Sequence, residues 1–284
     1  MLTPFQAVVF GIVQGITELF PISSLGHSVV LPALLGWNID QSAPFFLTFL
    51  IATHTATAIV LFFFFFNDWK RIIIGLIRSL KEREIKESDK DAKLGWLLVV
   101  ATIPAGILGL LFQDSLQSLF ANPSLVAGVL IFNGLLLFGA EFLRKKRKEQ
   151  ISTGSNERLA KITWFQAVKI GLLQSIALIP GFSRTGATLT GGLLTGLSHE
   201  DSARFAFLLA TPIIGAASLL KLPELAHASG PAITAAIIGA IAAGIAAFLS
   251  VKFLTRYFQT NTLTPFAVYC TVVGSLLTLL FFFR

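Results

Sequence analysis

The chain has 284 residues, of which 54% are hydrophobic and only 13% are charged, and its mean hydropathy is +0.77. Because a soluble globular protein carries about 25% charged residues, this composition excludes a soluble domain and predicts an integral membrane protein. The formal net charge is +7. The basic residues cluster beside apolar segments, so we interpret them as membrane anchors and not as a nucleic-acid-binding surface.

Six apolar segments are long enough to cross a hydrocarbon core of roughly 30 Å as helices, which predicts an all-α polytopic fold. Most of the lysines and arginines fall in two polar loops, 67–93 and 144–161. The positive-inside rule places both loops in the cytoplasm. The predicted spans are 43–66, 94–112, 124–143, 204–222, 231–254 and 263–283.

Two stretches of the chain align with each other without a gap. FQAVVFGIVQGITELFPISSLG (5–26) matches FQAVKIGLLQSIALIPGFSRTG (165–186), including the opening tetrapeptide and an internal glutamine. We interpret this as a duplication, with a first repeat at 1–150 and a second at 160–284. The basic loops give the two halves opposite orientations, which predicts the inverted-topology repeat found in many transporters.

The aligned stretches extend to 5–36 and 165–198, and neither is a simple span. Each has a short apolar helix, a break rich in Pro, Gly and Ser, and a second short apolar helix. Irregular backbone at membrane depth is tolerated only inside protein or beside a wet cavity. We therefore predict two re-entrant helical hairpins, one from each face, whose broken tips meet inside the bundle.

The first tip concentrates polar side chains in an apolar environment. Gln14 and Glu18 are four residues apart and share one helix face. Ser23, Ser24 and His27 follow at the start of the next short helix. Because the N–H groups at a helix start attract anions, this junction predicts an anion-binding site.

The second tip carries the motif PGFSRTGAT with a different charge. Gly181 permits close approach of the backbone, while Ser183, Thr185 and Thr188 offer hydroxyl groups. Arg184 offers a planar donor fork that suits phosphate oxygens. If the tips meet, a carboxylate and an imidazole face an arginine across one small polar chamber.

Plainer interpretations exist for the same residues. Glu18 and Arg184 could form a purely structural ion pair that locks the hairpins together, although ionisable residues inside a membrane are functional by default. His54, inside the first predicted span, is open to two interpretations: polar packing, or a place near the site. Cys270 is the only cysteine, so disulfides within the chain are excluded.

The paired signatures QGITELFPISSLGH and PGFSRTGAT resemble those of the undecaprenyl-diphosphate phosphatase family of the bacitracin-resistance type, over essentially the whole chain. The resemblance implies hydrolysis of undecaprenyl diphosphate to undecaprenyl phosphate and phosphate. This reaction recycles the lipid carrier of peptidoglycan synthesis and confers bacitracin resistance. The resemblance also implies a divalent cation, Mg²⁺ or Ca²⁺, and a bacterial plasma (inner) membrane protein whose active site faces the outside.

The family's functional residues carry over position by position onto the two tips. They fall on Gln14, Glu18, Ser24, His27, Gly181, Ser183, Arg184 and Thr188. Two departures bear on the metal site, for which Glu18 and Gln14 are the expected ligands. Position 14 is the amide variant of a Glu-or-Gln position, which removes one possible carboxylate ligand of the metal. Some members of the family also carry a carboxylate in the span that matches 43–66, whereas residues 28–67 here contain only Asp40.

The residues leave the mechanism and some partners open. Either Ser24 attacks the terminal phosphate, or a water held by His27 attacks it, and His27 is the favoured acid/base. The expected clamp for that phosphate is formed by Arg184, Ser183 and Thr188. The expected partners are a polyprenyl diphosphate lipid and membrane lipids, with no nucleic acid, and a homodimer is compatible with the sequence. The alternative functions are an inverted-repeat transporter or lipid flippase, the membrane phosphatase superfamily with a histidine nucleophile, and a structural scaffold.

Overall fold

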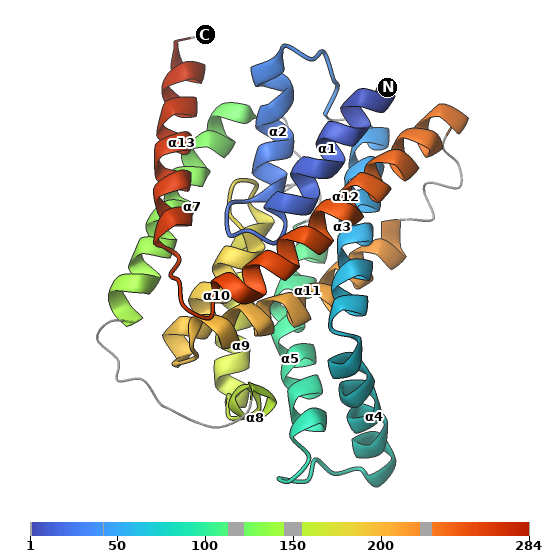
Figure 1. Ribbon diagram of the computed structural model, residues 1–284, viewed down its shortest axis with the longest axis vertical. Helices are drawn as coiled ribbons and strands as arrows, with labels where there is room; N and C mark the ends of the chain where they lie inside the picture. The colour runs from blue at the N-terminus through green and yellow to red at the C-terminus, as the bar shows by residue number, and fades with distance from the viewer. Residues whose placement is uncertain (1, 42, 113–121, 145–154, 222–228, 284) are drawn as a thin grey trace.

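The computed structural model describes residues 2–41, 43–112, 122–144, 155–221 and 229–283. Within these ranges the protein consists of helices and turns, with no β-strand (Figure 1). The helices are α1 (Pro4–Thr17), α2 (Ser24–Leu35), α3 (Pro44–Phe64), α4 (Phe66–Glu82), α5 (Lys90–Leu111), α7 (Pro123–Arg144), α8 (Ser155–Ala160), α9 (Trp164–Ser175), the 3₁₀ helix η1 (Ile176–Leu178), α10 (Arg184–Thr195), α11 (His199–Lys221), α12 (Gly230–Tyr257) and α13 (Thr264–Phe282).

Six of the described helices are long and apolar enough to cross a membrane, which confirms the six predicted spans. The protein is therefore a multi-pass α-helical membrane protein. The spans are Phe45–Phe64, Lys90–Leu111, Pro123–Arg144, His199–Leu220, Gly230–Tyr257 and Thr264–Phe282.

Residues 67–93, which composition predicted as a polar loop, mostly form α4 instead. This helix packs along α5, and Nε1 of Trp96 donates a hydrogen bond of 2.9 Å to Oγ of Ser79. An amphipathic helix carries its polar residues on one face only, so overall composition misled the prediction. In the other predicted loop, residues 145–154 lie outside the described ones and 155–160 form α8.

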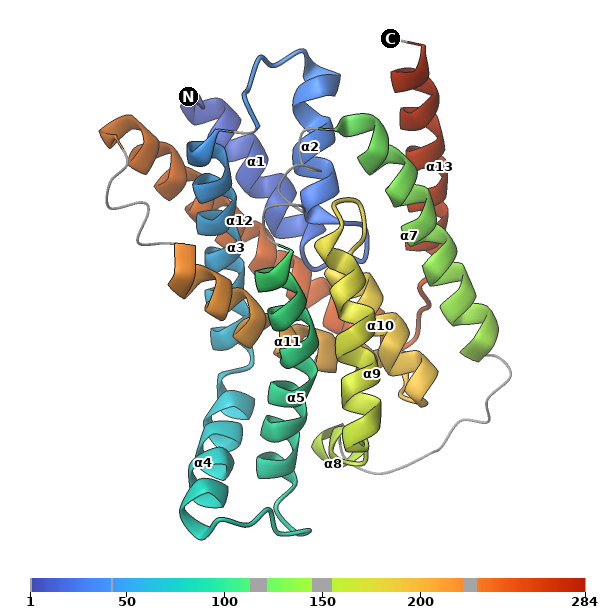
Figure 2. The same cartoon turned by 180° about the vertical axis from the view of Figure 1, so that it is seen from behind.

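Two helical hairpins lie at the centre of the bundle, α1 with α2 and α9 with α10 (Figure 2). Both begin with the same capping box, in which Thr3 pairs with Gln6 and Thr163 pairs with Gln166. The threonine hydroxyl accepts the glutamine N–H at 3.2 Å in each case. A capping box satisfies backbone donors that a helix start leaves unpaired. Insertion of the hairpins from opposite membrane faces stays a prediction.

Each hairpin packs on a span from the other half of the sequence. Helix α1 lies along α12, and α9 lies along α5. A Cβ atom added at Gly11 would collide with the carbonyl oxygen of Gly239, and one added at Gly171 would collide with that of Ala101. Small residues allow this close approach of membrane helices. The halves interlock in space, and the repeat boundaries at 1–150 and 160–284 stay a prediction.

Helices α7 and α13 form a pair that flanks the hairpins, and α7 contacts both α2 and α10. On the other side, α3 packs against α11 and α12. The turns of the two hairpins are thus enclosed between α7 and α3, at mid-height in Figure 1. This enclosure brings together side chains from both halves of the chain.

Candidate active site

The turn of the first hairpin is shaped by a capping serine. Glu18 closes α1, and its N–H donates to the carbonyl of Gln14 at 2.9 Å. Ser23 then adopts φ 71° and caps α2, its Oγ accepting the N–H of Gly26 at 3.1 Å. A non-glycine residue at positive φ is strained, and such strain is concentrated at functional sites.

The turn of the second hairpin repeats this capping hydrogen bond, but its serine has an extended backbone with φ −87°. Ser183 caps α10, and its Oγ accepts the N–H of Gly186 at 3.1 Å. Gly181 has φ 107°, and a Cβ added there would lie 2.7 Å from Cβ of Val129 on α7. Because only glycine fits this conformation in the available space, residue 181 fixes the turn against α7.

The two turns contact each other directly, as predicted from the sequence. Oγ1 of Thr185 donates a 2.8 Å hydrogen bond to the backbone carbonyl of Glu18. Oγ of Ser183 lies 3.5 Å from the carbonyl of Phe20. These contacts join the hairpins through backbone atoms, so the relative placement of their polar side chains is fixed.

Asn133, which the sequence analysis missed, bridges the same two turns from α7. Its Nδ2 donates to the carbonyl of Pro21, and its Oδ1 accepts the N–H of Ser183, both at 3.0 Å. The side chain is fully buried. A lone amide inside the apolar stretch 124–143 was the available signal, because polar groups at membrane depth need internal partners.

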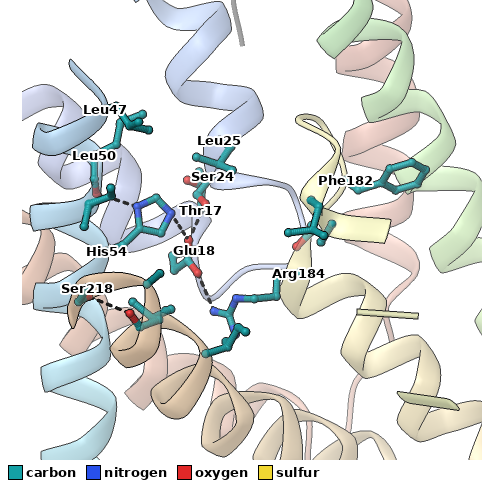
Figure 3. Close-up of a pocket in the computed structure, with 17 residues that line it drawn as sticks. Thr17, Glu18, Ser24, Leu25, Leu47, Leu50, His54, Phe182, Arg184 and Ser218 are labelled. Carbon is teal, nitrogen blue, oxygen red and sulfur yellow. Dashed lines mark hydrogen bonds and ion pairs between the residues drawn. The ribbon is translucent and has the colours of Figure 1, made fainter. Parts of the chain in front are cut away.

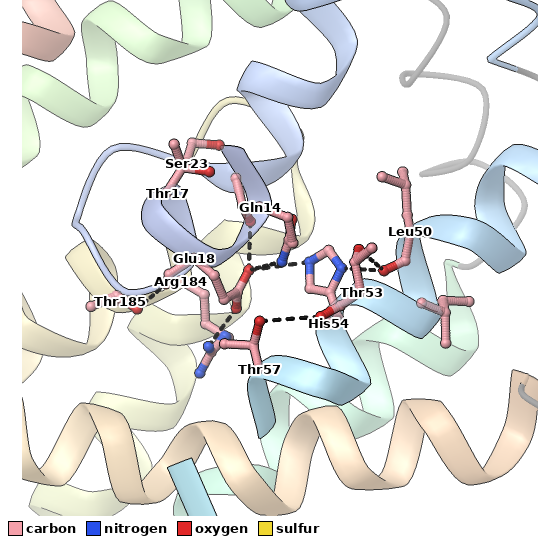
Figure 4. Close-up of polar contacts among 12 residues, drawn as sticks. Gln14, Thr17, Glu18, Ser23, Leu50, Thr53, His54, Thr57, Arg184 and Thr185 are labelled. Carbon is pink, nitrogen blue, oxygen red and sulfur yellow. Dashed lines mark hydrogen bonds and ion pairs between the residues drawn. The ribbon is translucent and has the colours of Figure 1, made fainter. Parts of the chain in front are cut away.

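The Glu18 carboxylate collects contacts from four helices (Figure 4). Oε2 accepts from Nε2 of Gln14 at 3.0 Å and from Oγ of Ser24 at 2.5 Å. Nε2 of His54, on α3, lies 3.1 Å from the same oxygen. Oε1 pairs with Nη2 of Arg184 at 2.6 Å. A buried carboxylate is tolerated only with such compensation.

A cavity of about 270 Å³ opens beside this carboxylate. Figure 3 labels six polar residues of its lining, Thr17, Glu18, Ser24, His54, Arg184 and Ser218. Ser183 also lines the cavity. The rest of the lining is apolar and comes mainly from α3, the 3₁₀ helix η1 and α11, with Leu25 of α2 and Phe182 of the second turn. The cavity therefore offers a few charged and hydroxyl groups within a lining that is otherwise mainly hydrocarbon.

Comparison with known proteins places the chain in a family. The family model described as "Bacitracin resistance protein BacA" matches residues 7–276. The chain belongs to this family. It is 41% identical to "Undecaprenyl-diphosphatase 2" of Frankia alni, over 99% of this chain and 98% of the relative. It is 45% identical to an "Undecaprenyl-diphosphatase" of Mycolicibacterium paratuberculosis, over 95% and 94% of the two chains. Identity to the one of Acidiphilium cryptum is 43%, over 97% of both chains.

In this BacA-family protein His27 does not line the cavity, whereas the sequence predicted that its imidazole would face Arg184 across a polar chamber. Its Nδ1 lies 2.6 Å from the carbonyl of Ser23, and its Nε2 lies 2.8 Å from the hydroxyl of Tyr269. The imidazole also stacks on the Tyr269 ring, with centroids 5.8 Å apart. The ring is held toward α13 by these contacts, whereas His54 occupies the position beside Glu18.

Several predicted substrate-binding residues support the site without lining the cavity. Ser23 caps α2 and Gly181 shapes the second turn, as described above. Thr185 binds the Glu18 backbone, and Oγ1 of Thr188 donates to the carbonyl of Arg184 at 2.9 Å. Gln14 is buried behind Glu18 and positions its carboxylate. Of these supporting residues, only Gln14 has a side-chain oxygen without a hydrogen-bond partner among the described residues.

Two buried atoms of the site have no hydrogen-bond partner among the described residues: Oε1 of Gln14 and Nη1 of Arg184. The described residues contain no group of three or more His, Cys, Asp or Glu arranged to hold a metal. The amide oxygen is an acceptor suited to a hard cation, and the guanidinium nitrogen is a donor suited to a phosphate oxygen. The Glu18 carboxylate and the Gln14 amide oxygen therefore fit a cation that takes most of its ligands from groups other than protein side chains.

Proposed function

We propose that this BacA-family protein hydrolyses undecaprenyl diphosphate to undecaprenyl phosphate and inorganic phosphate. The observation that carries the proposal is the contact of Glu18 with Ser24 and Arg184 in a cavity whose lining is otherwise mainly apolar. The undecaprenyl-diphosphatase names of relatives that match nearly the whole chain support it. The transporter alternative is not favoured by these names.

The mixed lining of the cavity matches the two parts of a diphosphate lipid. The head group is multiply charged, and phosphoryl transfer depends mainly on positioning and on neutralising that charge. The tail is hydrocarbon and gains from apolar contact. Leu47, Leu50 and Ile51 of α3, with Ile213 and Ile214 of α11, supply apolar contacts beside the polar groups.

Arg184 is the proposed clamp for the terminal phosphate. Its Nη2 pairs with Glu18, while its Nη1 has no partner among the described residues. A guanidinium can hold a carboxylate with one nitrogen and a phosphate oxygen with another. Arg184 would thereby stabilise the negative charge that the transferring phosphoryl group carries.

Ser24 is the proposed nucleophile, and Glu18 its base. The hydroxyl donates to Oε2 of Glu18 at 2.5 Å, so the carboxylate lies within reach of the proton that attack would release. Oγ of Ser24 would bond to the terminal phosphorus while the bond to the bridging oxygen breaks, and undecaprenyl phosphate leaves. Water then hydrolyses the phosphoserine, releasing phosphate and restoring the hydroxyl.

Direct attack by water is the alternative for the same reaction. In the structure, His27 binds Ser23 and Tyr269, so a role in holding this water would require its ring to leave those partners. Glu18, which already contacts the cavity, is the better placed base for a water as well. Both routes yield the same products.

A divalent cation, Mg²⁺ or Ca²⁺, forms part of the proposal. Glu18 and the free amide oxygen of Gln14 are the residues that would hold it. Mg²⁺ commonly binds through one or two carboxylates together with phosphate oxygens and waters, which fits so small a protein donor set. When bound, the cation would neutralise charge on the diphosphate.

The proposed setting is the plasma membrane of a bacterium, with the cavity open to the outside. The basic α4–α5 connection lies at the opposite end from both chain termini, and the positive-inside rule assigns that end to the cytoplasm (Figure 1). Hydrolysis there would return the lipid carrier to peptidoglycan synthesis and oppose bacitracin. A homodimer stays a prediction.

The test is release of phosphate by the purified protein from undecaprenyl diphosphate in detergent, with and without a chelator. We expect phosphate release that requires a divalent cation. In detergent there is no second compartment, so a pure transporter would release none. No release from a folded, monodisperse preparation supplied with cation would overturn the proposed function.

A further inference from the structure

His54 is a polar residue in the middle of the apolar span α3, where an isolated imidazole would be costly. Its ring has oxygen partners on both sides. Nδ1 lies 2.7 Å from the carbonyl of Leu50, and Nε2 lies 3.1 Å from Oε2 of Glu18 (Figure 4). The carbonyl contact fixes the ring so that Nε2 points at the carboxylate.

The other side-chain partners of Glu18 belong to the hairpins. Gln14 and Ser24 come from the first hairpin and Arg184 from the second. His54 connects this carboxylate to a full-length span, and its neighbours on the cavity wall, Leu50 and Ile51, are apolar. The position of the Glu18 carboxylate relative to the apolar wall of α3 therefore depends on His54.

The contact matters because His54 and Ser24 meet the same carboxylate oxygen. A base that receives a proton from a nucleophile must keep one oxygen aimed at it, and enzymes secure this with a third group that is bonded to the base. Ser24, Glu18 and His54 are arranged in that order, with separations of 2.5 Å and 3.1 Å. His54 at Oε2 and Arg184 at Oε1 together hold the orientation of the carboxylate.

We propose that His54 is a positioning residue for the phosphatase reaction, and that its Nε2–H holds Oε2 of Glu18 toward Ser24. The inference rests on the proposed function. It assigns His54 a role through Glu18, separate from that of His27, which faces Tyr269.

Two substitutions separate the two sides of the ring. In His54→Gln the side-chain amide nitrogen takes the place of Nε2 and can still donate to Glu18. In His54→Asn it takes the place of Nδ1, so it keeps the bond to Leu50 but does not reach Glu18. Loss of an outer-shell group that orients a metal-ligating side chain, the role also proposed for Glu18, typically costs about 10–100-fold in affinity or activity.

We expect His54→Gln to keep kcat within about 3-fold of wild type and His54→Asn to lose about 10–100-fold, the range found for orienting groups. KM should change little, since a misplaced base slows the chemical step without removing substrate contacts. The control is Thr53→Val, a buried neighbour whose hydroxyl bonds the same Leu50 carbonyl at 2.7 Å and does not contact Glu18. It should retain wild-type kcat.

The outcomes separate this inference from the proposed function. If wild type releases no phosphate, the proposed function fails. If wild type is active but Gln and Asn variants are equally slow, or equally fast, the positioning role of His54 is wrong. Thermal midpoints in detergent show whether each variant is folded. Should His54→Asn not fold, a folded His54→Gln that has lost about 10-fold or more in kcat still contradicts the proposal.

Discussion

Glu18 and Arg184, which are 166 positions apart in the sequence, form an ion pair of 2.6 Å between the two hairpin turns. Neither half of the chain can build this pair alone. Because both side chains line the cavity, a ligand phosphate would meet an arginine that the carboxylate already orients. The ion pair therefore holds the two hairpin turns together and also orients Arg184 for the proposed reaction.

Replacing Arg184 by alanine should lower kcat by about 10²–10³-fold, the usual cost of removing one preorganised group that stabilises transition-state charge. The kcat of Arg184→Lys should lie between those of wild type and Arg184→Ala, since lysine keeps the charge but loses the planar fork. The measurement is phosphate release under saturating substrate. The exposed Arg256→Ala is the matched control, and near-normal turnover in Arg184→Ala would exclude the clamp.

Attack by Ser24 predicts a covalent intermediate. With substrate labelled in the terminal phosphate, rapid acid quenching should trap label on wild-type protein and none on Ser24→Ala. Ser28→Ala is the control, because Ser28 is a buried serine of the same helix that does not line the cavity. Turnover without trapped label in wild type would favour direct attack by water.

Glu18→Gln should shift the dependence of activity on divalent cations. Removing the carboxylate charge from a site with few protein ligands weakens cation binding, so the half-saturating Mg²⁺ concentration should rise and the maximal rate should fall. Titration of phosphate release with Mg²⁺ and with Ca²⁺ measures both. An unchanged midpoint would place the cation away from Glu18.

Asn133→Leu should destabilise the contact between the hairpins. The substitution keeps the side-chain size but leaves the N–H of Ser183 and the carbonyl of Pro21 without this partner. Each buried polar group left unpaired costs about 1–3 kcal/mol. The measurement is the thermal midpoint in detergent, which should fall clearly below that of wild type. An unchanged midpoint would show that water or another group replaces the amide.

Gly171→Ala tests the interlocking of the two halves. Its added Cβ would collide with the carbonyl of Ala101, whereas a Cβ at Gly139, in α7, would meet nothing within 4 Å. Overpacking typically costs about 1–3 kcal/mol. Gly139→Ala should be neutral or slightly stabilising, because alanine favours a helix interior. Equal thermal midpoints for the two variants would argue against tight packing of α9 on α5.

The sequence by itself determined the six spans, because the thickness of the hydrocarbon core sets the length of apolar helix that is required, and apolar length is a local property of the sequence. It also located both hairpin turns, since Pro, Gly and Ser interrupt each repeat at the same place. The prediction that Glu18 and Arg184 meet came from the repeat, which relates the two turns by symmetry. The polar loop predicted at 67–93 was wrong, because α4 hides one apolar face among charged residues.

Only the tertiary structure decided which polar side chains surround Glu18. Asn133 is the only amide of α7 and His54 is the only histidine of α3, and no local pattern tells toward which neighbour such a side chain points. His27, adjacent to the motif in sequence, turns to Tyr269 across 242 positions, while His54 reaches Glu18 from α3. These contacts depend on how helices distant in sequence pack, and that packing is a property of the whole bundle.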